Sequence, residues 1–154
     1  MKTIVATLCY VKFNGKTLMM HRNKKQGDVH KGKWNGLGGK LEPGESPDEC
    51  VVREIREESG LSIRDPRLRG VLTFPEFKPG EDWLVFIYTA SRFDGDLGSC
   101  AEGELEWVED AKLMKLPLWE GDHIFLPWLD RDRFFSGKFT YLDGRLARHE
   151  VSFY

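Results

Sequence analysis

The sequence predicts an α/β fold of the α+β kind, in which a mixed β-sheet is covered by helices. Three observations carry this prediction: many short segments have the composition of β-strands, one segment has strong helix signals, and the two kinds do not alternate regularly. Regular alternation would instead favour a parallel sheet built from βαβ units. With 154 residues, of which 40% are hydrophobic and 31% charged, the chain fits one compact domain over residues 1–154.

The chain is expected to begin with a β-hairpin. Its two arms, Thr3–Phe13 and Thr17–His21, are rich in β-branched and apolar residues. They flank Asn14-Gly15-Lys16, in which the Asn-Gly pair is a strong signal for a tight hairpin turn. The run Ile4–Val11 also has some features of a signal peptide, but it is short and lacks a small-residue cleavage site. We therefore interpret this run as the first strand.

The segment His21–Lys40 differs in composition from the hairpin before it. It contains eight basic or histidine residues, five glycines and a single acid, Asp28. Glycines interspersed with charged residues favour a loop. We expect a cationic loop over this whole segment.

The strongest helix signals follow this loop. Ser46 can cap a helix, Pro47 suits its first position, and Glu49 completes a capping box three residues after Ser46. Gly60 is a natural stop, so a helix of about 13 residues is expected. Three aliphatic side chains on one stripe of this helix are expected to pack on the sheet: Val51, Val52 and Ile55.

The second half of the chain is expected to contain mainly strands. Its expected elements are strands at Leu68–Phe77, Trp83–Phe93 and Leu105–Val108, a helix at Trp119–Arg131, and strands at Lys138–Leu142 and Arg145–Phe153. The turn Lys78–Glu81 contains Pro and Gly and separates the first two strands. Asp143-Gly144 is a type I′ turn signal, so the last two strands are expected to form a hairpin.

Three glutamates of the predicted helix indicate a metal site. Glu54, Glu57 and Glu58 stand at i, i+3 and i+4, so their carboxylates share one face. Such hard oxygen ligands suit Mg²⁺ or Mn²⁺. The alternative is a solvated acidic surface, on which Arg53 and Glu57 form an ordinary i,i+4 ion pair.

The residues around these acids have a specific spacing. From Gly39 the chain runs through five residues to Glu45, then through seven residues to Arg53-Glu54-Ile55, and then through Glu57-Glu58 to Gly60-Leu61. This pattern resembles the Nudix box, G-x5-E-x7-R-E-U-x-E-E-x-G-U, in which U is a bulky aliphatic residue. Every constrained position matches, so the chain resembles the Nudix hydrolase family.

The resemblance implies a fold and a metal-dependent reaction. In this family the box is a loop–helix–loop on an α/β/α sandwich with a mixed sheet, and its glutamates coordinate Mg²⁺ against a substrate pyrophosphate. By position, the residues implied as metal ligands are Glu54, Glu57, Glu58, the carbonyl of Gly38, and a late glutamate, Glu102. Glu104 is a close alternative to Glu102, and Glu45 and Arg53 are implied to orient the helix and its acids. The general base stays open among Glu54, Glu57, Glu58 and an acid within 102–106.

The resemblance extends over most of the chain and narrows towards the MutT-like group, which hydrolyses oxidised purine nucleoside triphosphates such as 8-oxo-dGTP. The run Lys33–Lys40 carries much of this similarity. It implies that Asn35 hydrogen-bonds the purine edge, a role that suits a side chain with both a donor and an acceptor. The alternative is that Trp34 belongs to the core and that Asn35 is a turn residue.

The same resemblance places further residues at the base. Trp119 is implied to stack on the base and Asp122 to accept from its ring N–H groups, and Phe74 is a candidate for the other wall. From its charge, the basic loop around Arg22, Lys24 and Lys25 is a candidate for the outer phosphates, with Arg22 favoured, and solvated surface is the alternative. One related group has two consecutive aspartates where this chain has Gly121 before Asp122, which leaves base selectivity open. The alternative is that the aromatic residues of this region are core: Trp119, Phe125 and Trp128.

These features predict an Mg²⁺-dependent pyrophosphohydrolase, with Mn²⁺ as a possible substitute, acting on a small-molecule nucleotide. Hydrolysis of ADP-ribose or of a dinucleoside polyphosphate is an alternative, because the box defines the diphosphate chemistry and not the attached groups. A Nudix module that binds nucleotides without cleaving them is another. The intact set of acids argues against that module, since a binder has no need of all of them.

Charge and cysteine usage narrow the class of protein further. The formal net charge is −2, and bulk charge calls for neither a nucleic-acid nor a membrane partner. No segment approaches the roughly 18 apolar residues that span a bilayer. Three widely spaced cysteines lack zinc-site spacing and are expected as buried thiols: Cys9, Cys50 and Cys100. A cytoplasmic monomer or homodimer is expected.

Overall fold

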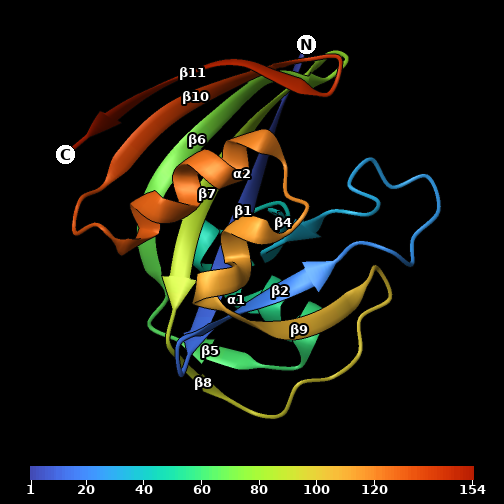
Figure 1. Ribbon diagram of the computed structural model, residues 1–154, viewed down its shortest axis with the longest axis vertical. Coiled ribbons are helices and arrows are strands. Elements are labelled where there is room, and N and C mark those ends of the chain that lie inside the picture. Colours follow the sequence, from blue (N-terminus) through green and yellow to red (C-terminus); the bar gives the residue numbers. More distant parts are fainter.

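The computed structural model describes all 154 residues (Figure 1). Its elements, in chain order, are β1 (Lys2–Phe13), β2 (Lys16–His21), β3 (Trp34–Asn35), β4 (Leu37–Lys40), α1 (Pro47–Ser59), β5 (Ser62–Arg64), β6 (Arg67–Lys78), β7 (Glu81–Ala90), β8 (Arg92–Asp94), β9 (Glu104–Glu109), the 3₁₀ helix η1 (Asp110–Lys115), α2 (Glu120–Phe125), the 3₁₀ helix η2 (Leu126–Asp130), β10 (Phe135–Leu142) and β11 (Arg145–Phe153). Strands therefore dominate, as expected.

The main sheet is mixed. Its strand order is β11-β10-β6-β7-β1-β2-β3, with β4 also paired to β1 and β9 to β2. The pairs β1–β7 and β6–β10 are parallel, and the other pairs are antiparallel. Strands β5 and β8 form a separate two-stranded sheet. The predicted mixed sheet without βαβ alternation is confirmed.

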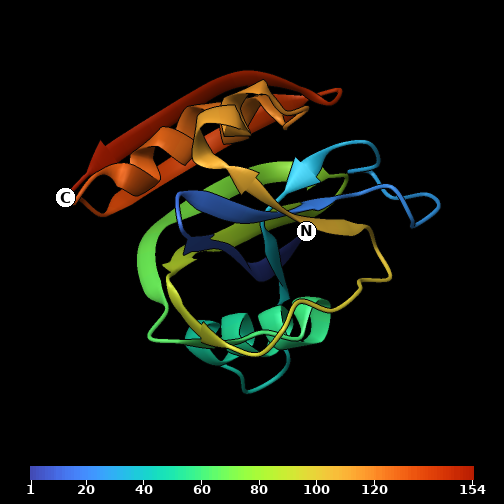
Figure 2. The ribbon, with the colours of Figure 1, turned by 60° about the horizontal axis from the view of Figure 1, so that its bottom comes forward.

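Successive residues of β1 serve the two faces of this sheet. Cys9 and Val11 belong to the core under α1, whereas Tyr10 between them belongs to the core under α2 and η2. This alternation follows from the period of two in a strand. The helices accordingly lie on opposite faces of the sheet (Figure 2), and the predicted α/β/α sandwich is confirmed.

The local turn and cap signals predicted their elements correctly. Asn14 and Gly15 both have positive φ, 51° and 71°, and join β1 to β2. Asp143 and Gly144 do the same between β10 and β11, with φ of 51° and 78°. Positive φ at both central residues is what a type I′ turn requires. The helix α1 also has the predicted 13 residues.

The prediction of a loop over all of His21–Lys40 is wrong. Residues 34–35 and 37–40 form β3 and β4. Glycine is a poor strand former, but Gly38 lies so close to β1 that a Cβ atom there would clash with the Thr7 carbonyl. The close approach of β1 therefore requires a glycine at this position, although glycine by itself favours a loop.

Three other expectations need correction. The helix expected over Trp119–Arg131 is α2 followed by η2, because Pro127 has no N–H with which to continue an α-helix. The strand expected over Trp83–Phe93 ends at Ala90, and the residues after it join the small sheet. Val52 is 37% exposed and does not share the buried stripe of α1.

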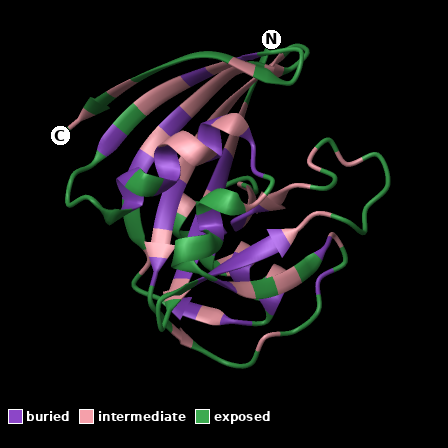
Figure 3. Ribbon diagram, in the orientation of Figure 1, coloured by how far each residue is buried: buried purple, intermediate pink, exposed green.

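Burial follows the layers of the fold. The central strands and the inner faces of the helices are buried, whereas the loop after β2 is largely exposed (Figure 3). The three cysteines are free thiols and buried, as predicted. No helix has both the length and the apolar character needed to cross a membrane.

Candidate functional site

The glutamate-rich helix is capped at both ends. The Ser46 hydroxyl accepts the Glu49 N–H, and the Glu49 carboxylate accepts the Ser46 N–H. Gly60 ends the helix with a φ of 83°, in the left-handed region that favours glycine. Val51 and Ile55 are fully buried against the sheet. These constraints fix which face of the helix carries the acids.

Arg53 is held by the loop that precedes its own helix. Its Nε donates to Glu45 Oε2 at 2.6 Å, and its Nη2 donates to Glu45 Oε1 at 2.9 Å. Nη2 also donates to the Lys40 carbonyl. The Arg53 guanidinium lowers the pKa of Glu45 to about 2, so this pair is ionised at neutral pH.

The same guanidinium reaches two of the helix acids. Arg53 Nη1 lies 2.8 Å from Glu54 Oε1 and 3.1 Å from Glu57 Oε2. The ordinary i,i+4 ion pair with Glu57 is therefore present, but it is one of several contacts of a shared arginine. Arg53 thus sets the positions of Glu54 and Glu57 relative to Glu45.

Glu58 is partly buried and lacks a cationic partner. Its Oε1 accepts the Gly38 N–H at 2.9 Å. Burial, together with the nearby charges of Glu102 and Glu54, raises the pKa of Glu58 to about 8. Burial also raises the pKa of Glu54. This corner therefore gathers more negative charge than its protein cations compensate.

Gly39 allows one of these acids to lie where it does. A Cβ atom at position 39 would come within 2.5 Å of both the carboxylate carbon and Oε2 of Glu54. No side chain fits there without moving Glu54. The glycine at the start of the box is therefore required by close approach and not by a special backbone angle.

The acids match a hard divalent cation in donor type and in charge. They supply carboxylate oxygens, and they repel one another as they stand. No group of three or more His, Cys, Asp or Glu side chains is close enough to hold a metal ion as arranged. The set therefore fits Mg²⁺ in its chemistry and is not a preformed cage.

The two late glutamates differ in their surroundings. The negative charge of Glu102 helps to raise the pKa of both Glu54 and Glu58, so Glu102 lies near the helix acids. Glu104 instead accepts a hydrogen bond from Asn23 at 3.2 Å. The structure thus brings Glu102, and not Glu104, towards the box.

Arg22 already has carboxylate partners. Its Nε donates to Asp28 Oδ2 at 2.8 Å, and its Nη2 lies 3.4 Å from Glu102 Oε2. Its charge is therefore directed at protein acids in this conformation, and a phosphate would have to compete with them.

The residues expected at the base lie on the other face of the sheet, among buried aromatic side chains. Phe74 and Trp119 each contact Tyr141 edge-on or at a tilt, with ring centroids 6.4 and 5.6 Å away. Trp119 is 9% exposed and Asp122 is 8% exposed. Trp119 lies just before α2 and not within a helix. Trp119 belongs to the hydrophobic core, as the alternative interpretation predicts.

Polar groups without partners are buried in the same region. Asn35 Oδ1 and the Tyr10 hydroxyl have no hydrogen-bond partner in the protein. Burial raises the pKa of Asp122 to about 7, and Lys33 opposes this shift. Tyr10 lies between Asn35 and Asp122: burial raises the pKa of Tyr10, the charge of Asp122 raises it further, and Gly36, next to Asn35, lies close to the Tyr10 ring. Buried polar atoms are rarely left unpaired without a reason.

Sequence reasoning missed several residues of this region. The sequence predicts Tyr10 and Phe77 only as strand residues, in Thr3–Phe13 and Leu68–Phe77. His30 and Lys33 lie in the glycine-rich segment after β2, yet both contact Trp119. Nothing local in the sequence signals these contacts, because Trp119 is 89 positions from His30.

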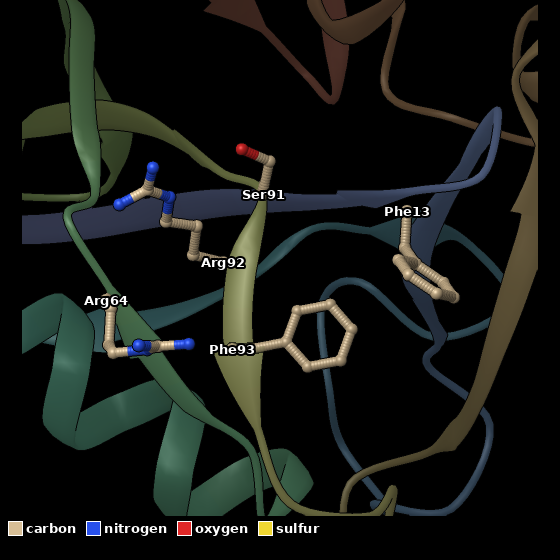
Figure 4. Close-up of a pocket in the computed structure, with 5 residues that line it drawn as sticks. All are labelled: Phe13, Arg64, Ser91, Arg92 and Phe93. Atoms are coloured by element: carbon tan, nitrogen blue, oxygen red, sulfur yellow. The ribbon is translucent and has the colours of Figure 1, made fainter.

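A cavity of about 500 Å³ lies elsewhere, beside the two-stranded sheet (Figure 4). It is lined by Phe13, Arg64, Ser91, Arg92 and Phe93. Both arginines are exposed and pair with neighbouring aspartates. None of the predicted site residues lines this cavity, so it is separate from the candidate site.

Comparisons with known proteins show which family the chain is similar to. The NUDIX domain model matches residues 2–129. The uncharacterized Nudix hydrolase YvcI of Bacillus subtilis is 33% identical over 141 residues, covering 88% of this chain and 85% of that protein. The oxidized purine nucleoside triphosphate hydrolase of Mus musculus is 32% identical over 112 residues, covering 73% of this chain and 72% of that protein.

A solved structure extends the likeness to the fold. The crystal structure of the MutT protein from Bacillus halodurans superposes with a TM-score of 0.85 at 31% identity, and the match covers 97% of each chain. The family model covers far more than half of this chain. The chain therefore belongs to the Nudix family and is a MutT-like Nudix hydrolase that acts on pyrophosphate bonds.

Proposed function

We propose that the chain hydrolyses an oxidised purine nucleoside triphosphate, with 8-oxo-dGTP as the favoured substrate, to the monophosphate and pyrophosphate. This reaction would remove oxidised nucleotides from the pool used for DNA synthesis. Residues 1–154 would act as one domain in the cytoplasm, as a monomer or homodimer, on free nucleotides and not on nucleic acid or membranes.

The metal end of the proposed site consists of oxygen donors. Glu54, Glu57, Glu58, Glu102 and the Gly38 carbonyl would hold Mg²⁺, for which Mn²⁺ could substitute. When bound, the cation would neutralise phosphate charge, polarise the P–O bond and make a water molecule more acidic. The crowding of Glu54, Glu58 and Glu102 raises the pKa of Glu54 and of Glu58, and it supports this assignment because Arg53 and Arg22 pair with Glu54 and Glu102 but no cation pairs with Glu58.

The chain's own groups would complete the reaction. One of the four glutamate carboxylates takes the proton of the attacking water. Arg53, held by Glu45 through two hydrogen bonds, keeps Glu54 and Glu57 in place. Arg22 would exchange an acidic partner for an outer phosphate oxygen, since both are anionic acceptors.

The observation that carries the choice of a purine is the unpartnered Asn35 Oδ1. A buried acceptor costs free energy unless a donor reaches it, and a purine edge presents N–H donors. Asp122 would read the same base: with a pKa of about 7 it has both protonation states available at neutral pH. Trp119 and Phe74 would provide the aromatic walls.

The test is a substrate panel with product analysis in the presence of Mg²⁺. The panel contains 8-oxo-dGTP, dGTP, dATP, ADP-ribose and a dinucleoside tetraphosphate. The proposal predicts the highest kcat/KM for 8-oxo-dGTP, with 8-oxo-dGMP and pyrophosphate as products. Preferential cleavage of ADP-ribose or of the dinucleotide would contradict the choice of substrate. Binding without cleavage of any compound would contradict the catalytic assignment.

A further inference from the structure

His30 connects the exposed segment after β2 to the tryptophan proposed to stack on the base. The Trp119 indole Nε1 donates to His30 Nδ1 at 2.7 Å. The two rings are nearly perpendicular, with an interplanar angle of 81° and centroids 5.5 Å apart. The imidazole also stacks on Phe77, with ring centroids 6.2 Å apart. The imidazole is therefore in contact with two aromatic rings of this region.

The protonation state of His30 suits an acceptor. Nδ1 can accept the indole N–H only when it carries no proton. Burial lowers the pKa of His30 to about 4, with a further contribution from Arg22 and smaller ones from Lys78 and Lys33, while Asp28 opposes them. The imidazole is thus neutral at physiological pH, and the hydrogen bond persists there.

The backbone around His30 is tied to the rest of the protein. Asp28 Oδ1 accepts the His30 N–H at 3.0 Å, and Asp28 Oδ2 accepts from Arg22 at 2.8 Å. The Asp28 side chain is almost fully buried. Arg22 directly follows β2, so this chain of contacts anchors His30 to the sheet.

Lys33 covers a second part of the same tryptophan. Its ammonium lies 4.8 Å from the centroid of the Trp119 ring, over its face. Phe77 and Tyr141 both approach Trp119 edge-on. Among these contacts, His30 is the one that bonds to the indole N–H, so it restricts rotation of the ring about the Cβ–Cγ bond of Trp119.

We propose that His30 is a specificity-determining residue that positions Trp119 for stacking on the purine. This inference rests on the proposed function, because it takes Trp119 as the base platform. An aromatic ring fixed before the ligand arrives loses less conformational freedom on binding. Without His30, the indole N–H needs another partner and the ring is free to turn. His30 therefore acts on base affinity and not on the phosphate chemistry.

The experiment has one readout for the contact and one for base binding. The contact is followed by the ¹⁵N–¹H resonance of the Trp119 indole, assigned with Trp119→Phe. Base binding is followed as the affinity for 8-oxo-dGMP without metal, which needs no hydrolysis. The variants are His30→Ala and His30→Asn, whose amide oxygen can take the place of Nδ1. His149→Ala is the control, since His149 contacts other aromatic rings, Trp128 and Phe139.

His30→Ala is expected to shift the indole resonance upfield and to weaken 8-oxo-dGMP binding about 5- to 10-fold. His30→Asn should bring the indole resonance and the 8-oxo-dGMP affinity most of the way back to their wild-type values. His149→Ala should change neither the resonance nor the affinity. In the active enzyme, KM for 8-oxo-dGTP should rise far more than kcat falls. On a Trp119→Phe background, His30→Ala should have no further effect, because the donor is gone.

Unchanged affinity in His30→Ala, with the indole resonance shifted, would overturn the inference. So would the absence of any 8-oxo-dGMP binding by the wild type. If 8-oxo-dGMP binds in a His30-dependent way but no nucleotide is hydrolysed, the proposed function fails and the inference stands. If 8-oxo-dGTP is hydrolysed but the 8-oxo-dGMP affinity is the same in His30→Ala as in the wild type, the inference alone fails.

Discussion

The Glu45 carboxylate holds the Arg53 guanidinium through two hydrogen bonds, of 2.6 and 2.9 Å. Glu45 lies in the loop before α1 and Arg53 lies within the helix, so the pair fixes one to the other. From this position Arg53 contacts Glu54 and Glu57. A change at Glu45 should therefore alter the positions of Glu54 and Glu57, although Glu45 itself needs no contact with substrate.

Glu45→Gln is expected to lower kcat/KM by about 10- to 100-fold, the usual effect of removing a partner that orients metal ligands. An amide keeps the shape but cannot accept two charge-assisted bonds from one guanidinium. Glu42→Gln is the matched control, because the Glu42 side chain is exposed and its carboxylate lies 3.6 Å from Arg53, farther away than that of Glu45. Equal losses in the two variants would count against the orienting role of Glu45.

Gly39→Ala should impair activity more than it impairs folding. The added methyl would lie 2.5 Å from the Glu54 carboxylate, which must then move. We expect a fall in turnover of about 100-fold, as small misplacements in a catalytic site can cause, with a small change in melting temperature. Gly98→Ala is the control, since its nearest contact would be an ordinary 3.4 Å. Normal turnover in Gly39→Ala would show that Glu54 can move without loss.

Asp122→Asn should change how stability depends on pH. The pKa of Asp122 is raised by burial from 3.8 to about 7, so its carboxyl favours the folded state fully below pH 3.8, and this contribution is lost as pH rises through 7. Between pH 4 and 8 the wild type should lose about 3 to 5 kcal/mol more unfolding free energy than the variant, which does not titrate. Chemical denaturation at several pH values measures the difference. Parallel pH profiles would show that Asp122 titrates normally.

Glu102→Gln and Glu104→Gln should separate the two late glutamates. Glu102 faces the helix acids, whereas Glu104 bonds to Asn23. Glu102→Gln is expected to weaken Mg²⁺ activation by at least about 10-fold, and Glu104→Gln to change it by less than about twofold. Mg²⁺ titration of the initial rate measures both. A larger effect at Glu104 would reverse the assignment.

Local signals in the sequence were enough to predict the helix that carries the acids. The Ser46 cap, the capping box with Glu49 and the Gly60 stop act within a few residues of the chain, so neighbours in sequence decide them. The hairpin turns at Asn14-Gly15 and Asp143-Gly144 are decided in the same way. The spacing of the box then placed the glutamates on one face of that helix.

Contacts between distant segments could not be predicted in this way. The glycine-rich strand β4 exists because β1 lies against it, and composition alone argues for a loop there. The 3₁₀ helix after α2 places Leu126, Trp128 and Leu129 in the core against residues of distant strands. His30 meets Trp119 only because the segment after β2 folds back across the base region. Tertiary structure overrides local propensity at each of these places.

Turnover of 8-oxo-dGTP by Glu57→Gln, with saturating Mg²⁺, tests the central claim most directly. Glu57 is exposed, so its amide should leave thermal unfolding unchanged. If the helix carboxylates hold the cation against the phosphates, kcat should fall by at least about 100-fold. Turnover equal to that of the wild type, in a variant with an unchanged melting temperature, would contradict the claim.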